Sequence, residues 1–190
     1  MIDRWWETLR QVLSLPTAPM YEQAVVEYVR LFASRRDLPV RADAFGNLLV
    51  GPANRGDETS RQRGSPWVFA AHMDHPGFVT TRRRGRTVWA EFRGGVAAEY
   101  FDDAPVLLQP PDGPVRAACR SIDKPTGPVR RGLRRARLEL EAAATVPAGT
   151  IGMWDVDVVS RRGKTISARA CDDLAGVAAV LCALDELCRE

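Results

Sequence analysis

The stretch VFAAHMDHPGFV, residues 68–79, contains both histidines of this 190-residue chain. An apolar run ends in His72, skips one residue to Asp74 and is followed by a Pro-Gly turn. Short continuous apolar runs are typical of strands buried on both faces, so WVFAA, residues 67–71, predicts a strand of an α/β layer. Ligands of open α/β sheets bind beyond the carboxyl ends of the strands. The His-x-Asp pair is therefore a candidate site.

The residues before this stretch predict the first part of the same layer. Apolar residues at helical spacing indicate helices at 2–14 and 20–34, separated by the helix-breaking sequence LPTAP. The sequence LPVRADAFGNLLVG, residues 38–51, predicts two short strands about a turn at 45–47. The polar segment 52–66 contains Gly and Pro and predicts an exposed loop. Helices that alternate with strands indicate an α/β layer.

The residues after 77 change in character. Short β-like runs separated by turn residues extend from 78 to 159, with helical periodicity only near 131–143. This pattern predicts a mostly β module inserted into the α/β layer. The sequence GKTISARACDDLAGVAAVLCALDELCRE then indicates a turn, a strand, the pair Asp172 and Asp173, and a helix with an apolar stripe. Carboxylates at a helix N-terminus interact favourably with the helix dipole.

The composition is that of a soluble globular protein, with 45% hydrophobic and 27% charged residues. No apolar run reaches the 18 residues of a transmembrane helix, and the N-terminus lacks the apolar core of a secretory signal. The four cysteines form no CxxC motif, which favours reduced thiols in the cytoplasm; they are Cys119, Cys171, Cys182 and Cys188.

The net charge of +3 arises mainly from arginine, which is densest at 82–86 and 130–137. A nucleic-acid surface would combine such clusters with interleaved aromatic residues and a binding motif, and the sequence shows neither. We therefore interpret the clusters as a solvated face and expect neither nucleic acid nor a membrane as a partner.

The chemistry of the two acidic motifs suits a metal site. His72 can present an imidazole nitrogen to a metal, Asp172 has two oxygens that can bridge two ions, and Asp74 can hold the histidine in one tautomer. Each signal alone is weak. A lone histidine at a strand end is more often structural, and paired acids that open a helix are more often a cap.

The two motifs together match a family. HMDHPGF at 72–78, followed by ARACDDLAGVAAVLCAL at 168–184, resembles the M42-type dinuclear metalloaminopeptidases, which are related to the M20 and M28 peptidases. The resemblance covers the whole chain as the N-terminal portion of such an enzyme. It implies a partial three-layer zinc-peptidase-like catalytic domain of the α/β class at 1–79 and 161–190. It also implies an inserted small β-barrel domain, used for oligomer contacts, at 80–160.

The resemblance assigns a role to each residue of the two motifs. His72 is similar to a metal ligand, Asp74 to the catalytic-site acid that orients it, and Asp172 to the carboxylate that bridges two divalent ions, zinc or cobalt. Asp173 follows in a peptide bond that is commonly cis in this superfamily, and Gly176 lets the helix pack close to the site. A site of histidine and carboxylates also accepts manganese, so the sequence leaves the metal open.

The sequence departs from the family pattern in two ways. His75 stands where many members have an acid, and we interpret it as a loop residue; Leu174 stands where arginine is common. In addition, the family's Glu-Glu pair, a further acid and a distal histidine come downstream of the Asp-Asp helix and are absent from these 190 residues. Each metal of a hydrolytic pair needs about three protein ligands and a general base. We therefore expect weak metal binding and no activity from this chain alone.

Three functions remain open at this point. The first is a metal-dependent aminopeptidase, acting on peptides and assembled as a homo-oligomer. The second is a non-catalytic relic or an oligomer-forming module. The third is a carboxypeptidase or deacylase of the M20/M28 type with the same metal core.

Overall fold

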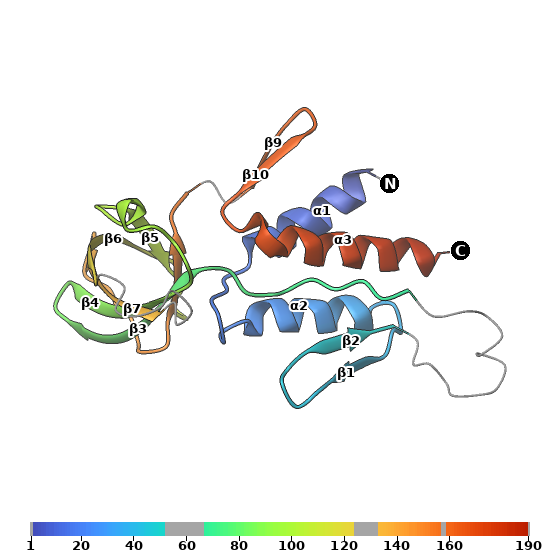
Figure 1. The fold of residues 1–190 in the computed structure, drawn as a ribbon, viewed down its shortest axis with the longest axis horizontal. Coiled ribbons are helices and arrows are strands. Elements are labelled where there is room, and N and C mark those ends of the chain that lie inside the picture. Colours follow the sequence, from blue (N-terminus) through green and yellow to red (C-terminus); the bar gives the residue numbers. More distant parts are fainter. Residues whose placement is uncertain (1, 52–66, 124–132, 157–158, 190) are drawn as a thin grey trace.

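The computed structural model describes residues 2–51, 67–123, 133–156 and 159–189. Three helices lie together at one end of the molecule and a β-barrel lies at the other (Figure 1). The helices are α1 (Ile2–Ser14), α2 (Gln23–Ser34) and α3 (Cys171–Leu187). The loop predicted at 52–66 lies outside the described residues.

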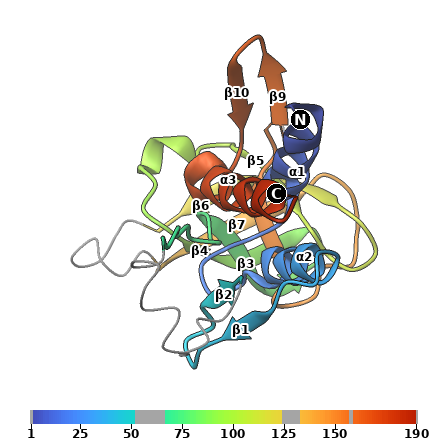
Figure 2. The ribbon, with the colours of Figure 1, turned by 90° about the vertical axis from the view of Figure 1, so that its right-hand side faces the viewer.

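The three predicted helices are confirmed, and their apolar stripes meet in one core. Helix α1 packs along α3. Helix α2 lies on the other side of the extended chain that precedes residue 77 (Figures 1 and 2). Helix α2 starts at Gln23 rather than at 20, because Met20 has a left-handed φ of 72° that a helix cannot include. The buried residues of this core are Val12, Leu13, Val25, Val29, Phe32, Met153, Ala170, Leu174, Val177, Ala178 and Leu181.

The inserted module is a closed antiparallel barrel with the strand order β3-β4-β7-β6-β5-β8, in which β8 pairs with β3. Its strands are β3 (Gly77–Arg84), β4 (Thr87–Arg93), β5 (Pro105–Leu108), β6 (Val115–Ile122), β7 (Leu133–Leu140) and β8 (Ile151–Trp154), and a short 3₁₀ helix, η2, spans Ala98–Tyr100. Four rings meet inside the barrel with centroids 4.7–6.2 Å apart; they are Phe78, Phe92, Phe101 and Trp154. Closure leaves the barrel without a free sheet edge.

The helix expected near 131–143 is wrong, because residues 133–140 form strand β7. Ala136, Leu138 and Leu140 point into the barrel, and polar residues between them point outward. This is a period of two, which belongs to a strand. The alternation is hard to see in the sequence because Arg134, on the inner side, is also buried, donating to the backbone oxygen of Val96.

The strand expected at 67–71 is also wrong. These residues run between α2 and α3 without a strand partner among the described residues (Figure 1). Trp67, Val68 and Phe69 are 90%, 74% and 64% exposed. A run that is apolar at every position suits a strand with neighbours on both edges and cover on both faces. Ala71 packs against the helical core, and so does Met73 two residues after it.

Two separate hairpins complete the fold. The strands predicted around the turn at 45–47 are confirmed as β1 (Val40–Ala42) and β2 (Leu48–Val50). The strand predicted before Asp172 is β10 (Thr165–Ala168), which pairs with β9 (Val159–Arg162) and with no other strand of the described residues. No sheet therefore lies between the helices in the described residues, and the three-layer catalytic domain is not confirmed. The barrel strands run from Gly77 to Trp154, and the proposed division into domains at 79 and 160 stays a prediction.

Among the described residues, no helix combines the length and apolar character needed to cross a membrane. All four cysteines are free thiols.

On the barrel wall, the guanidinium of Arg82 lies 4.1 Å from the ring centre of Trp89, whose cross-strand neighbour is Arg137. The arginine and aromatic residues thus alternate across strands, which sequence order does not reveal.

Candidate functional site

The structure brings together two of the predicted site residues that are 100 positions apart in the chain. The Nε2 atom of His72 lies 3.1 Å from Oδ1 of Asp172. His72 lies in the segment that leads into β3, and Asp172 lies at the first turn of α3. At Asp172 the backbone is not helical, with φ −94° and ψ 106°, so its carboxylate leaves the helix end toward the segment.

Asp74 determines the tautomer of His72. The Nδ1 atom of His72 lies 3.0 Å from Oδ1 of Asp74 and 3.2 Å from its backbone oxygen. Both oxygens can only accept, so Nδ1 carries a hydrogen and donates it. The other nitrogen, Nε2, is then the one that faces Asp172. This orientation by a carboxylate is typical of histidines that bind metals.

The contact between Nε2 and Asp172 requires a cation. With a hydrogen on Nδ1, neutral imidazole has a lone pair on Nε2, which would face the negative oxygen of Asp172. A proton on Nε2 or a metal ion removes this repulsion. Partial burial lowers the pKa of His72, but the carboxylate of Asp74, the hydrogen bond with Asp172 and the charge of Asp173 outweigh it, so the pKa lies above its usual value. The donor set therefore fits a positive charge at this point.

Asp173 and Gly176 support the pair from the helix side. The peptide bond between Asp172 and Asp173 is cis, as the family resemblance implies. The Oδ2 atom of Asp173 accepts a hydrogen bond of 3.3 Å from the backbone N–H of His72. A side chain at position 176 would collide with this carboxylate, because its Cβ would lie 2.7 Å from the Asp173 Cγ. Glycine at 176 therefore leaves room for the Asp173 carboxylate in this position.

The loop LPTAP contacts the residues that follow His72. The hydroxyl of Thr17, which is fully buried, donates a hydrogen bond of 2.9 Å to the backbone oxygen of Met73. A Cβ at Gly77 would lie 3.0 Å from the backbone oxygen of Thr17, so glycine permits this close approach. The residues between His72 and Gly77 are thus fixed at both ends of a short turn.

His75 lies in a loop, as its sequence position suggested, but it also makes a contact that was not predicted. Its Nδ1 atom lies 2.9 Å from the backbone oxygen of Asp172. The only signal in the sequence is that a second histidine follows the His-x-Asp motif directly. Its partner is 97 residues away, so spacing could not reveal it.

The pair is open to solvent and has few donors. The side chains of His72 and Asp172 are 54% and 92% exposed. Among the described residues, no group of three or more His, Cys, Asp or Glu side chains is arranged to hold a metal ion. The residues present thus fit a metal through two donor side chains and one orienting carboxylate. A catalytic zinc site usually has about three protein ligands, so this set is incomplete. The predicted roles of these residues stay predictions.

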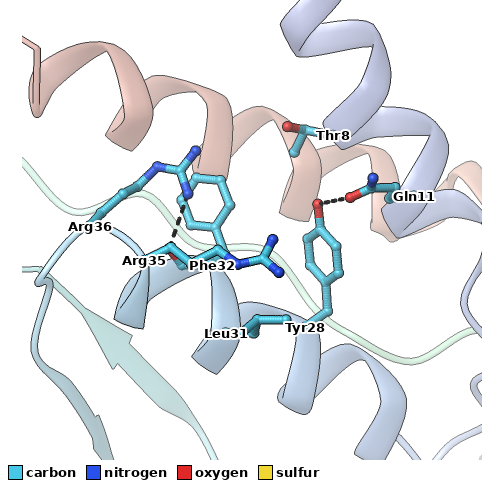
Figure 3. A pocket seen from close by; sticks show the side chains of 7 residues that line it. All are labelled: Thr8, Gln11, Tyr28, Leu31, Phe32, Arg35 and Arg36. Carbon is cyan, nitrogen blue, oxygen red and sulfur yellow. Dashed lines mark hydrogen bonds between the residues drawn. The ribbon is translucent and has the colours of Figure 1, made fainter.

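A separate small pocket of about 110 Å³ lies between α1 and α2 (Figure 3). Its walls are Thr8, Gln11, Tyr28, Leu31, Phe32, Arg35 and Arg36. Ligand pockets usually measure about 300–1,000 Å³, so this one is too small for a peptide. Arg36 is already paired with Asp185, 13 residues after Asp172 on α3, which is roughly 20 Å along a helix. The pocket is therefore distant from the His72–Asp172 pair.

No family model matches the sequence, and no curated protein matches it. Solved structures do match. An aminopeptidase from the archaeon Desulfurococcus kamchatkensis superposes with a TM-score of 0.68 over 97% of this chain at 21% identity. Over the part of that structure which it spans, the chain has the same fold. The TET1 peptidase of Pyrococcus horikoshii gives a TM-score of 0.69 over 96% of the chain at 20% identity. The TET aminopeptidase of Thaumarchaeota archaeon SCGC AB-539-E09 gives 0.67 over 96% at 16%.

These matches confirm the resemblance to the N-terminal portion of an M42-type peptidase, whereas the three-layer catalytic domain that it implies is not confirmed. The chain spans about half the length of these structures, covering 52%, 56% and 53% of them. The Pyrococcus horikoshii TET1 peptidase is described as assembling into a tetrahedron or a large octahedral shell. At such low identity the likeness concerns the fold.

Proposed function

We propose that this chain carries one part of the metal site of an aminopeptidase that hydrolyses peptides. The observation that supports this most strongly is the convergence of His72 Nε2 and Asp172 Oδ1 at 3.1 Å, with Asp74 behind the ring. Exposed ion pairs contribute only about 0–1 kcal/mol to stability, so stability alone is a poor reason for this arrangement. A site for a cation accounts for it better.

In this proposal each residue has a distinct task. His72 offers the Nε2 lone pair, and Asp74 keeps the hydrogen on Nδ1. Asp172 supplies carboxylate oxygens beside Nε2, and Asp173 holds the backbone of His72 in place. A divalent ion such as zinc or cobalt, held by these residues, would supply Lewis-acid polarisation of the scissile carbonyl and activation of water. Further ligands and a general base have to come from a polypeptide segment other than the described residues.

The surface beside the site is consistent with such a segment. The side chains of Trp67, Val68 and Phe69 are exposed, and the segment that bears them has no strand partner among the described residues. Contiguous exposed apolar side chains mark surfaces that another polypeptide covers. The homo-oligomer is proposed on the likeness to TET peptidases, and the closed barrel is the element proposed to make its contacts.

The absence of a three-donor group in the described residues favours a second candidate, a non-catalytic module that retains the barrel. To separate the candidates, the protein is purified from its own cell with whatever segments accompany it. It is then assayed with zinc or cobalt against amides with a free and with a blocked N-terminal amine. Hydrolysis that needs the free amine and is lost in His72→Ala supports the aminopeptidase.

The other results of this assay have equally definite meanings. Hydrolysis of the blocked substrates would indicate the carboxypeptidase or deacylase alternative. A metal-loaded protein that hydrolyses neither substrate class would favour the non-catalytic module. Asp155→Asn serves as a matched control, because Asp155 pairs with Arg116 on the barrel and should leave activity unchanged.

A further inference from the structure

His75 makes a contact that neither the motif nor the proposed chemistry uses. Its ring is half-buried, and Nδ1 lies 2.9 Å from the backbone oxygen of Asp172. A carbonyl oxygen only accepts, so Nδ1 of His75 carries the hydrogen. The two histidines of one short turn therefore contact the same residue, His72 at its carboxylate and His75 at its carbonyl.

Asp172 needs such a contact because the helix does not orient it. Its φ of −94° and ψ of 106° lie outside the helical region, although α3 begins at Cys171. Its side chain is 92% exposed, so packing does not restrict the carboxylate. The side chains that form hydrogen bonds with oxygens of Asp172 among the described residues are the two histidines, His72 at the carboxylate and His75 at the carbonyl.

We propose that His75 is a positioning residue whose Nδ1–H bond to the Asp172 carbonyl holds the Asp172 carboxylate opposite Nε2 of His72. The inference rests on the proposed function, because the pair that is held is the candidate metal pair. His75 is not itself a third ligand in the described arrangement, since no three-donor group includes it. Its role is exerted through Asp172.

Two amide substitutions separate the positions of the ring nitrogens. The side-chain nitrogen of asparagine stands near the place of Nδ1, and that of glutamine stands near the place of Nε2. His75→Asn should therefore keep the donor to the Asp172 carbonyl, while His75→Gln and His75→Ala should lose it. Each variant also leaves His72 as the only histidine, so its ring signals can be assigned without ambiguity in a nitrogen-15 NMR spectrum.

The measurement is the His72 ring shift in the metal-free chain, taken on the acidic plateau, where the protonated ring supplies the cation that the contact with Asp172 requires and a change in protonation does not contribute. Asp172→Ala defines the shift of a His72 that has lost its partner. We expect His75→Gln and His75→Ala to move the His72 signals toward this reference and His75→Asn to leave them near the wild-type values. Equal shifts in Asn and Gln variants, or unchanged shifts in the Gln and Ala variants, would overturn the proposal.

A check on the unaltered chain does not depend on folding of the variants. The His75 ring of the wild-type protein should be in the Nδ1–H tautomer, and an Nε2–H tautomer would refute the hydrogen bond directly. Unfolding temperatures of all variants show whether a shift reflects lost structure.

Zinc affinity provides an independent readout. Loss of an outer hydrogen bond typically lowers metal affinity about 10–100-fold, so we expect that loss in the Gln and Ala variants and near wild-type affinity in the Asn variant. If the wild-type chain binds no zinc, the proposed function fails, while the NMR shifts still decide the role of His75. A uniform loss of affinity across all three variants would contradict the positioning role.

Discussion

The carboxylate of Asp173 occupies the space that a side chain at position 176 would need, and from there it accepts the backbone N–H of His72. A helix glycine is ordinarily less favourable than alanine by about 0.5–1 kcal/mol. Here glycine is retained where it permits a contact between the helix and the His72 segment. The relationship makes position 176 part of the candidate site, although Gly176 has no functional group.

Gly176→Ala should therefore destabilise the chain by about 1–3 kcal/mol, the usual range for an overpacked site, instead of stabilising a helix. Urea unfolding measures this change. The matched background is Asp173→Ala, which removes the obstructing carboxylate. In that background Gly176→Ala should become neutral or stabilising, and a double-mutant cycle isolates the coupling. Equal effects in both backgrounds would show that the carboxylate does not occupy this space.

Phe69 and Phe78 offer a second test, nine residues apart in the chain. Phe69 is 64% exposed, whereas Phe78 is fully buried in the barrel. Phe78→Ala should cost about 3–5 kcal/mol of unfolding free energy, and Phe69→Ala should change it by less than about 0.5 kcal/mol. Denaturant titrations of the isolated chain compare the two. A large effect of Phe69→Ala would mean that the segment before His72 is buried.

Asp185 joins the helices from the far end of α3. It is 5% exposed and lies 2.6 Å from Arg36 and 3.3 Å from Arg189. Burial raises the pKa of Asp185, but hydrogen bonds and charges from these two arginines outweigh it and lower the pKa below its usual value. The carboxylate therefore contributes stability above the pKa of an unfolded Asp, about 3.9, and loses it as the pH falls through the lower folded pKa.

Asp185→Asn should accordingly lower the unfolding free energy at pH 7 by about 1.5–3 kcal/mol, because the partly buried guanidinium of Arg36 loses its hydrogen bond to a charged group. The difference between variant and wild type should shrink below about pH 4, as the wild-type carboxylate also becomes neutral. Glu7→Gln is the matched control, since Glu7 pairs with Arg10 on the exposed face of α1. A pH-independent difference would contradict the account.

Thiol labelling tests the barrel core. Burial raises the pKa of the Cys119 thiol to about 11, with a weak opposing hydrogen bond to Ser121, whereas Cys171 and Cys188 are exposed. At pH 8 the thiolate of Cys119 should amount to about one part in a thousand, and the thiolate is the reactive form. Iodoacetamide followed by mass spectrometry should modify Cys171 and Cys188 in minutes and Cys119 only after unfolding. Early modification of Cys119 would show that the barrel opens.

Local patterns predicted most of the fold. The helical stripes of α1, α2 and α3 depend on neighbours within two turns, so the sequence reveals them directly. Strand β7 escaped detection because the buried guanidinium of Arg134 interrupts the expected alternation. The strand expected at 67–71 failed for another reason. A continuous apolar run predicts that its side chains are buried by neighbouring strands. The described residues contain no strand beside residues 67–71.

The candidate site could be predicted as a set of residues but not as an arrangement. The motifs and their family resemblance pointed to His72, Asp74, Asp172, Asp173 and Gly176. The contact of His75 with the Asp172 carbonyl could not be foreseen, because backbone atoms leave no trace in residue identity. The exposure of His72 and Asp172 also depends on what covers them, which the spacing of residues in the sequence cannot predict.

The most direct test of the central claim is a zinc titration of the nitrogen-15-labelled chain, observed at the two histidine rings. If His72 and Asp172 form part of a metal site, zinc should shift the Nε2 signal of His72 first and saturably, with weak affinity because only two donors converge. Asp172→Ala should abolish the selective shift. A His72 signal that does not respond, or a response that is unchanged in Asp172→Ala, would contradict the claim.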